Sequence, residues 1–389
     1  MPRKGLARIF NYRIFKGSQG KPDKVFIGLF LLILAFGMIV LSSASAFVSY
    51  RWYGNTTYFV IHQLLYGLLP GLLVLYIGSK IDYHIWKKLA FPLLIVTIIL
   101  LIAVFLPGIG LEKNGAHRWI HLGAFTLQPS EIAKLTFLLY LATWFSSKGK
   151  THLKNFSYGF LPFLVLLGVL GGLIILQPDM GTMGVIVMMS FVMFFNAGAK
   201  LSHLVMAFFG GLGVVALLIK LEPYRLNRLT TYLHPELDIH GVGYHVYQAL
   251  VAVGSGGFLG RGFGHSRQKF NYLPEPFTDS IFAIISEEMG LFGAVCTISL
   301  ILAFAFRGFT IARRAPDEFG RLLVIGVMSW FVLQAFVNIG AMLKLIPLTG
   351  IPLPFISYGG SALLVSMFAV GIVINVSRQS VRYEKNTSV

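Results

Sequence analysis

Long apolar stretches separated by short polar segments fill most of this chain. Ten stretches approach or exceed the length of about 20 residues that a helix needs to cross the hydrocarbon core of a membrane. They lie at 26–48, 58–78, 89–107, 130–147, 159–177, 180–197, 202–220, 279–306, 322–346 and 355–376. A backbone inside a membrane must satisfy its own hydrogen bonds, so each stretch is predicted to be a helix. The pattern predicts an all-α polytopic membrane protein with ten transmembrane helices.

The basic residues indicate how these helices are oriented. An even number of spans places both ends of the chain on one side, and residues 1–24 carry seven Lys or Arg against one acid. The loops expected on that side carry eleven Lys or Arg, whereas 49–57 on the other side carries only Arg51. Positive charge marks cytoplasmic loops. We therefore expect a multi-pass protein of the cytoplasmic (inner) membrane with both termini in the cytoplasm.

The expected organisation has one transmembrane domain, 26–377, between a basic cytoplasmic tail, 1–25, and a second cytoplasmic tail, 378–389. A large extracytoplasmic loop, 221–278, separates the seventh and eighth spans, and it is long enough to hold short helices of its own. Within it, 241–263 mixes apolar residues with seven glycines. That composition suits a segment that packs against the membrane or re-enters it, where irregular backbone must be covered by protein.

Composition excludes several functional classes. The chain is 56% hydrophobic and 12% charged, which a soluble protein could not cover with polar surface. The net charge of +17 is spread over short loops, so it indicates topology and anionic lipid rather than nucleic acid. The single cysteine, Cys296, leaves no disulfide. Phosphate-binding GxxxxGK[ST] loops, HExxH helices and Cys/His clusters are missing from the sequence, which argues against ATP-driven and zinc chemistry.

Asp279 stands at the boundary between the long polar loop and the eighth apolar span. An ionisable side chain at a membrane edge is costly, which makes it a candidate functional residue. There is a structural alternative. Asp279 follows Thr278, a good N-cap, and an acid in the first helical turn is favoured by roughly 0.3 to 1 kcal/mol.

Four further charged residues are expected on the same external side. Arg118 lies in the loop 107–129, Glu131 and Lys134 open the fourth span, and Asp179 lies in the fifth turn. Structural alternatives exist here as well. Arg118 beside Trp119 suits an interfacial anchor, Glu131 and Lys134 are three apart and could neutralise each other, and an acid after a proline suits a turn.

This one-sided distribution favours an enzyme acting on an externally displayed lipid headgroup. A transporter more naturally places its charges near the membrane midplane. Glu287 and Glu288 lie about 12 to 13 Å deeper than Asp279 along the eighth span. At least one of them is expected to face the bundle interior, because a carboxylate facing lipid at that depth is costly.

Several longer motifs occur together. They are NGAHRWIHLG, QPSEIAKL, QPDMGT, GSGGFLGRGFGHSRQKFNYLPEPFTDSIFAIISEEMG and PLTGIPLPFISYGGSALL. Their order and spacing over residues 107–376 resemble the SEDS family of shape, elongation, division and sporulation proteins, and the FtsW and SpoVE branch more than the RodA branch. One departure stands out: where many members have His-Thr-Asp-Phe, this chain has Phe277, Thr278, Asp279 and Ser280.

The resemblance implies a ten-span peptidoglycan glycosyltransferase that polymerises lipid II, the undecaprenyl-pyrophosphate-linked disaccharide pentapeptide, on the outer face of the membrane. It implies a role in cell division or cell shape. The implied partners are a class B penicillin-binding protein transpeptidase and other divisome or elongasome membrane proteins. In such a protein Asp279 is the catalytic residue, Glu131 and Lys134 belong to the active-site cavity, and Arg118 is a further functional position.

The chemistry of the candidate residues is compatible with glycosyl transfer. The acceptor hydroxyl needs a base, and Asp279 serves if burial raises its pKa towards neutrality. The departing pyrophosphate needs positive charge, for which Arg118, Lys134 and Lys269 are candidates. Asp179 is included among the substrate-binding residues. No cofactor is certain, because no ligand spacing establishes a divalent cation (Mg or Mn) on Asp279, Glu131 or Asp179.

Two alternatives from other classes stay open. In the first, the chain is a lipid II flippase or proton-coupled lipid transporter that uses Asp279 with Glu287 or Glu288 as a proton relay. In the second, the chain is chiefly a scaffold for division or elongation partners.

Overall fold

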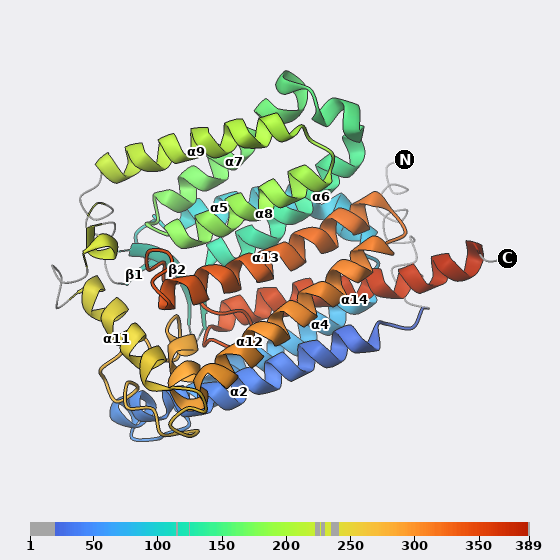
Figure 1. Ribbon diagram of the computed structural model, residues 1–389. Coiled ribbons are helices and arrows are strands. Elements are labelled where there is room, and N and C mark those ends of the chain that lie inside the picture. Colours follow the sequence, from blue (N-terminus) through green and yellow to red (C-terminus); the bar gives the residue numbers. More distant parts are fainter. Residues whose placement is uncertain are drawn as a thin grey trace.

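The computed structural model describes residues 20–113, 116–123, 125–221, 226, 230–234 and 241–387. Most of the predicted basic tail and parts of the loop 221–278 lie outside this set. The helices run roughly side by side in one bundle (Figure 1). One end of the bundle, called the tail end below, holds the start of α2 (Lys24–Tyr53) and the end of α14 (Gly360–Thr387). The other, the loop end, holds a small sheet and α11 (Val242–Ser255).

The predicted spans are helical. Within the part of the chain that the structure describes, seven helical segments are long and apolar enough to cross a membrane. They are α2; Tyr58–Lys80, which joins α3 (Tyr58–Gln63), the π-helical turn η2 (Leu64–Leu68) and α4 (Leu69–Lys80); α5 (His84–Ala103); Phe156–Ile175, which joins η3 (Phe156–Phe160) and α7 (Leu161–Ile175); α12 (Ile281–Arg313); α13 (Glu318–Met342); and Gly360–Ser380 of α14. The other three predicted spans coincide with α6 (Pro129–Leu153), α8 (Met180–Asn196) and α9 (Leu201–Leu221). The prediction of a polytopic helical membrane protein is confirmed.

Helix α13 forms the centre of the bundle. It packs against α12, α8, α6 and α14. Its residues 322–331 are buried on every side, and Trp330 is completely enclosed. A helix that is apolar around its whole circumference is buried by its neighbours. The polar side chains Ser329, Gln334 and Asn338, which lie on this central part of α13 and the turns after it, are therefore inside the protein.

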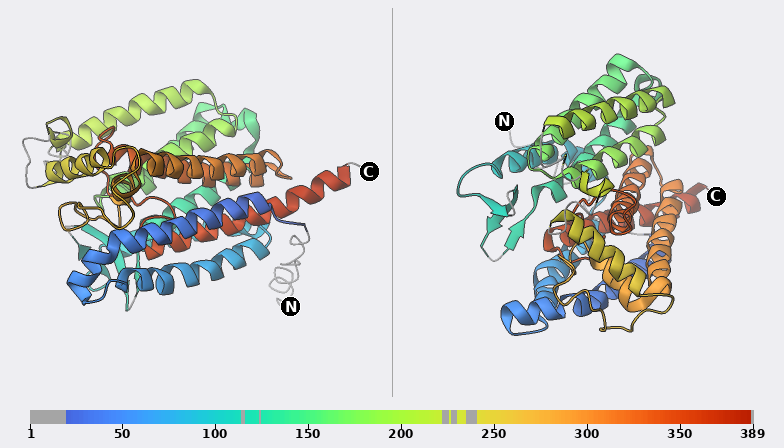
Figure 2. Two further views of the ribbon diagram at one scale, coloured as in Figure 1. Left: turned by 60° about the horizontal axis from the view of Figure 1, so that its bottom comes forward. Right: turned by 60° about the vertical axis from the view of Figure 1, so that its left-hand side comes forward.

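The loop 107–129 contains a sheet that the sequence analysis did not predict. Strands β1 (Gly110–Lys113), β2 (Ala116–Leu122) and β3 (Phe125–Leu127) pair antiparallel in that order. On β2, Ala116 and Ile120 lie on one face of the strand and are buried, whereas His117 and His121 lie on the other face and are exposed, as in a half-buried strand. The sheet and α11 lie on different sides of the loop end (Figure 2). The loop 221–278 holds α11, which confirms the prediction of a short helix there.

Helix α12 is broken at Gly290, where φ is 65° and ψ is −162°. The backbone of the glycine-rich segment 257–262 fills the break. The amides of Arg261 and Gly262 donate to the carbonyls of Glu287 (3.0 Å) and Glu288 (3.0 Å), and the Leu291 amide donates to the Gly257 carbonyl (2.9 Å). Irregular backbone inside a membrane helix survives only where protein groups satisfy it. The glycine-rich segment supplies those groups.

Gly290→Ala should destabilise the protein by about 2 to 5 kcal/mol, because a left-handed residue would gain a side chain and the bundle would be overpacked. A Cβ at Gly290 would overlap the backbone of Gly260 and Phe258. Thermal unfolding in detergent measures the loss. Gly184→Ala in α8 is the matched control, because its Cβ meets nothing within 4 Å. Equal unfolding temperatures for the two variants would refute this role of Gly290.

Candidate active site

Asp279 lies just outside α12 at the loop end. The helix begins at Ile281, its N-cap is Ser280, and its first turn holds no acidic residue. The alternative in which Thr278 caps the helix and Asp279 occupies its first turn is therefore wrong. Helix capping does not explain why a carboxylate stands here.

The surroundings of the Asp279 carboxylate contain no compensating cation among the described residues. Its Oδ1 lies 3.2 Å from the Thr278 hydroxyl, which also lies 2.9 Å from Oε2 of Glu275. A Cβ on Gly350 would lie 3.8 Å from its Oδ2. A second carboxylate and a glycine from the segment before α14 thus border the Asp279 side chain.

These surroundings raise the pKa of Asp279 to about 7. Burial is the largest cause, and the negative charge of Glu275 adds to it, while hydrogen bonds from the Thr278 hydroxyl and nearby amides act in the opposite direction. A general base works best when its pKa lies near the operating pH. The pKa of Asp279 is therefore raised towards neutrality, as a catalytic base in this position requires.

Glu131 and Lys134 form a buried ion pair inside the bundle. The Lys134 ammonium lies 2.8 Å from Oε1 of Glu131, donates to Oε1 of Gln334 at 2.7 Å, and lies 4.9 Å from the centre of the Trp330 ring. The exposed fractions of Lys134 and Glu131 are 0% and 2%. The other oxygen of Glu131, Oε2, has no hydrogen-bond partner among the described residues. The two residues do pair locally, but the pairing leaves one buried acceptor unused.

Two amide side chains on α13 connect this ion pair to Asp279. Gln334 donates to the Pro352 carbonyl at 2.8 Å, and Asn338 donates to the carbonyls of Ile351 and Asp279, both at 2.7 Å. Gln334 and Asn338 are four residues apart in the sequence. Their amides therefore lie on one face of the helix, about 6 Å from each other. The segment 351–352 therefore bridges the surroundings of Lys134 and the backbone of Asp279.

The sequence analysis missed Gln334 and Asn338. The signal that could have found them is their spacing: two amides four residues apart, on one face of the largely apolar span 322–346. Buried polar groups are retained where they are hydrogen-bonded, and inside a membrane span they mark functional interiors.

Arg118 and Asp179 hold the turn between α7 and α8. Arg118 donates through Nε to the Gln177 carbonyl (2.9 Å) and through Nη2 to the Pro178 carbonyl (2.5 Å). Asp179 caps α8 by accepting from the Thr182 amide (3.2 Å), and its Oδ2 accepts from the Ser130 hydroxyl (3.0 Å). Both oxygens of Asp179 are thus engaged, so it fits the turn interpretation better than substrate binding. Arg118 keeps Nη1 available.

Lys269 differs from the expectation of a substrate-binding cation. Its ammonium donates to the Ser43 hydroxyl (3.0 Å), the Gly264 carbonyl (2.7 Å) and Oε1 of Glu288 (2.8 Å), and its exposed fraction is 4%. A lysine has three donors, and all three are used here. In this conformation Lys269 holds the loop onto α12 and has no donor left for a substrate.

Glu287 and Glu288 face the interior, as predicted for at least one of them. Glu287 accepts from the Ser266 hydroxyl (2.5 Å) and from the amides of Arg267 (2.9 Å) and Gln268 (3.2 Å). Glu288 accepts from Lys269 and from the Ser43 hydroxyl. These partners fix both carboxylates to the loop, and no described contact links either of them to Asp279.

Phe277 and Ser280, the two positions where the sequence departs from the His-Thr-Asp-Phe pattern, each contact a residue that is distant in the sequence. Phe277 packs against Phe59 and Tyr358, with ring centres 4.4 and 5.6 Å apart. The hydroxyl of Ser280 lies 2.6 Å from Nε2 of His245 on α11. A histidine distant in the sequence therefore contacts the residue next to Asp279, which the sequence pattern did not reveal.

Fold and site together define a polytopic helical membrane protein with a buried ion pair and a carboxylate of raised pKa at one end of its bundle. Residues 23–382 match the model of a family of FtsW, RodA and SpoVE proteins, described as cell cycle proteins. The chain belongs to this family.

Several relatives are similar over nearly their whole length. Stage V sporulation protein E of Bacillus subtilis is 41% identical over 363 residues, covering 93% of this chain and 99% of that protein. A probable peptidoglycan glycosyltransferase FtsW of Trichlorobacter lovleyi is 39% identical over 355 residues, covering 91% and 93%. The match to the FtsW and SpoVE branch agrees with the sequence analysis.

Solved structures share the fold. A chain from a peptidoglycan synthase complex that coordinates polymerization and crosslinking superposes with a TM-score of 0.77 at 28% identity, covering 92% of this chain and 98% of that one. The rod shape determining protein RodA of Thermus thermophilus gives a TM-score of 0.68 at 28% identity, covering 92% and 97%.

Asn338→Leu should lower turnover per folded molecule at least tenfold, because it removes both donors that hold the Asp279 and Ile351 carbonyls. Each unpaired buried carbonyl also destabilises the fold by about 1 to 3 kcal/mol. The matched control is Asn375→Leu, which removes buried bonds to the Ser79 carbonyl and the Tyr83 amide far from Asp279. Turnover and unfolding temperature are measured for both. A similar loss of turnover in the control would reduce Asn338 to a purely structural residue.

Proposed function

We propose that this chain polymerises lipid II into glycan strands by inverting glycosyl transfer, with Asp279 as the general base. The chain is a peptidoglycan glycosyltransferase by its family and by the FtsW relatives that carry this name. One observation supports the assignment of the base above all others: Asp279 is a partly buried carboxylate outside its helix, without a cation partner among the described residues and with a pKa raised to about 7.

The reaction requires a base for the acceptor proton, departure of the pyrophosphate and stabilisation of its negative charge. Asp279 removes the proton from the acceptor hydroxyl while that oxygen forms the new bond to the anomeric carbon of the donor sugar. The bond to the lipid pyrophosphate breaks on the opposite face, and the pyrophosphate leaves with the electron pair. Cations positioned for that charge stabilise the transition state.

The proposal assigns the cationic role to Lys134 and Arg118. Lys134 keeps one donor beyond its bonds to Glu131 and Gln334, and Arg118 keeps Nη1. Glu131 orients the Lys134 ammonium. Asp179 and Lys269 hold the surrounding turns rather than the substrate, because their own hydrogen bonds occupy them.

A divalent cation, Mg or Mn, remains part of the proposal. Asp279 has no cation partner among the described residues, and magnesium often takes one or two carboxylates together with substrate phosphates. When bound there, the ion would neutralise charge on the pyrophosphate. Among the described residues, no three ligating side chains converge, so the substrate would complete its coordination.

The proposed topology has ten spans in one transmembrane domain, 26–377, both termini in the cytoplasm, and the loop 221–278 with Asp279 on the outer side. The helices at all ten predicted positions and the common end for the start of α2 and the end of α14 support it. The proposed partner is a class B penicillin-binding protein, together with other divisome or elongasome proteins. A similar chain comes from a complex that coordinates polymerization with crosslinking.

The transporter alternative has less support. It needs Glu287 or Glu288 as a movable proton carrier, yet these carboxylates accept hydrogen bonds from Ser266, Arg267, Gln268, Ser43 and Lys269. These bonds hold both carboxylates against Ser43 and residues 266–269, and no described contact links either of them to Asp279.

Asp279→Asn should lower lipid II polymerisation at least a hundredfold, the usual scale for loss of a general base. The assay uses purified protein, lipid II and excess magnesium, with gel separation of the glycan products, and is repeated with a chelator. Glu275→Gln is the matched control: it also replaces a carboxylate by an amide beside Thr278, and it should keep most of the turnover. Near-normal polymerisation by Asp279→Asn would remove Asp279 from the mechanism.

Turnover should fall as the pH drops through about 7, because Asp279 becomes protonated there and no longer accepts a proton. In Glu275→Gln this limb should move to lower pH, since a negative charge that raises the pKa is gone. A pH profile of the polymerisation rate checks both. The free energy of unfolding changes in the opposite direction to turnover. A carboxyl whose pKa is higher in the folded than in the unfolded protein makes the fold less stable as the pH rises from about 4 towards 7. Asp279→Asn should therefore unfold no earlier than the wild type at pH 8.

A further inference from the structure

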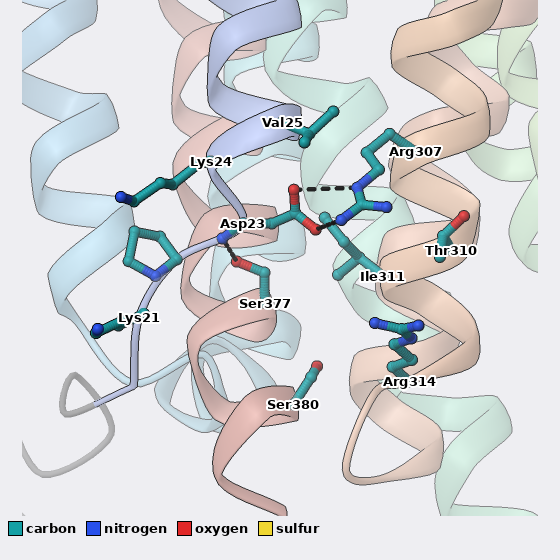
Figure 3. A pocket seen from close by; sticks show the side chains of 11 residues that line it. Lys21, Asp23, Lys24, Val25, Arg307, Thr310, Ile311, Arg314, Ser377 and Ser380 are labelled. Atoms are coloured by element: carbon teal, nitrogen blue, oxygen red, sulfur yellow. Dashed lines mark hydrogen bonds and ion pairs between the residues drawn. The ribbon is translucent and has the colours of Figure 1, made fainter. Parts of the chain in front are cut away.

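A cavity of about 330 Å³ opens at the tail end, the end of the bundle opposite to Asp279. It lies between the start of α2, the last turns of α12 and the part of α14 that carries Ser377 and Ser380 (Figure 3). Its volume falls in the range of ligand sites, about 300 to 1,000 Å³. Nothing in the proposed glycosyl transfer uses this cavity.

The lining of the cavity is cationic. Lys21, Lys24, Arg307 and Arg314 contribute positive charge, and Asp23 is the one carboxylate among the lining residues. Figure 3 shows Arg307 reaching to Asp23, and the two form a two-point ion pair, with Nη2–Oδ2 at 2.7 Å and Nε–Oδ1 at 3.1 Å. Asp23 is thereby neutralised. Lys21 and Lys24 keep the lining positive.

The hydroxyl groups of the lining are already committed. Ser377 donates to the Ile374 carbonyl (2.8 Å), and Ser380 donates to the Val376 carbonyl (3.0 Å). A hydroxyl has a single proton to donate. Recognition of a ligand therefore depends on the lysine and arginine side chains, which select an anion.

Apolar surface leads away from the cavity along both neighbouring helices. On α2, Val25 and Leu32 have exposed fractions of 55% and 56%; on α12, Leu302 and Phe306 have 52% and 76%. Both helices are long and apolar enough to cross a membrane. A ligand that fits the cavity and this surface together has an anionic head and apolar chains.

We propose that the cavity binds the phosphate headgroup of an anionic phospholipid, with the acyl chains lying along α2 and α12. Basic pockets between membrane helices bind such headgroups, and arginine offers a fork of donors that matches phosphate oxygens. A bound headgroup bridges the start of α2 and the end of α12, at or next to which the cationic residues lie, and contacts α14. Because it binds the folded bundle, it raises the unfolding temperature.

The test measures thermal unfolding of the purified full-length protein in a neutral detergent, titrated with phosphatidylglycerol, with phosphatidylcholine or with inorganic phosphate. Phosphatidylglycerol should raise the unfolding temperature saturably, and the other two should not at the same concentrations. Lys21→Gln/Lys24→Gln should need about 25-fold more phosphatidylglycerol for half the effect, or about fivefold per charge. Both side chains are exposed, so the fold tolerates the change.

The matched control is Lys148→Gln/Lys154→Gln, which removes two exposed charges at the same end but outside the cavity. Helix α6 starts beside β3 at the loop end, so Lys148 and Lys154 lie at the tail end. Arg314→Gln is a second variant from a different helix and should weaken the response about fivefold. An equal weakening in the lysine control would overturn the site in favour of general surface attraction. If inorganic phosphate raises the unfolding temperature as much as phosphatidylglycerol does, the cavity is a site for free anions and not for a lipid headgroup. If phosphatidylcholine raises it as much, charge plays no part in the binding.

Discussion

The constraint on which the structure depends is that every charge and backbone group inside the bundle must find its partner within the protein. The break in α12 shows how this is met. At Gly290 the helix leaves its own hydrogen-bond pattern, and the segment 257–262 supplies the missing donors and acceptors. Glu287 and Glu288 then bind the following residues, 266–269. The chain that leads to Asp279 is thus anchored to the helix that follows Asp279.

Against this background Asp279 is an exception. Lys134 has Glu131, Lys269 has Glu288, and Asp23 has Arg307, but no described cation pairs with Asp279. A partly buried carboxylate next to a second carboxylate prefers to be protonated near neutral pH. The fold maintains this unfavourable arrangement because Asn338 and the segments around it are fixed by their own hydrogen bonds. An acid held with a pKa near 7 is suited to accepting a proton in catalysis.

The same reasoning separates candidate substrate-binding residues from residues that stabilise the fold. Asp179 and Lys269 are charged and near the loop end, which made them candidates, yet their hydrogen-bonding capacity is used by the protein itself. Glu131, Lys134 and Arg118 each retain an unused oxygen or nitrogen. Unused capacity is costly in buried polar groups such as Glu131 and Lys134, and its presence on two neighbouring elements, α6 and β2, supports a site that a substrate completes.

The sequence by itself determined the helical spans, the side on which the charges gather and the candidacy of Asp279, since hydrophobic length and charge are local properties of the chain. It did not determine the sheet in 107–129, whose strands are short. It also did not determine which lysine and arginine side chains form ion pairs within the protein. The tertiary structure alone decided that Lys269 pairs with Glu288, that Asn338 holds the Asp279 carbonyl, and that His245 contacts Ser280. The physical reason is that these contacts join residues on different elements, so they depend on how helices pack and not on the pattern along any one of them.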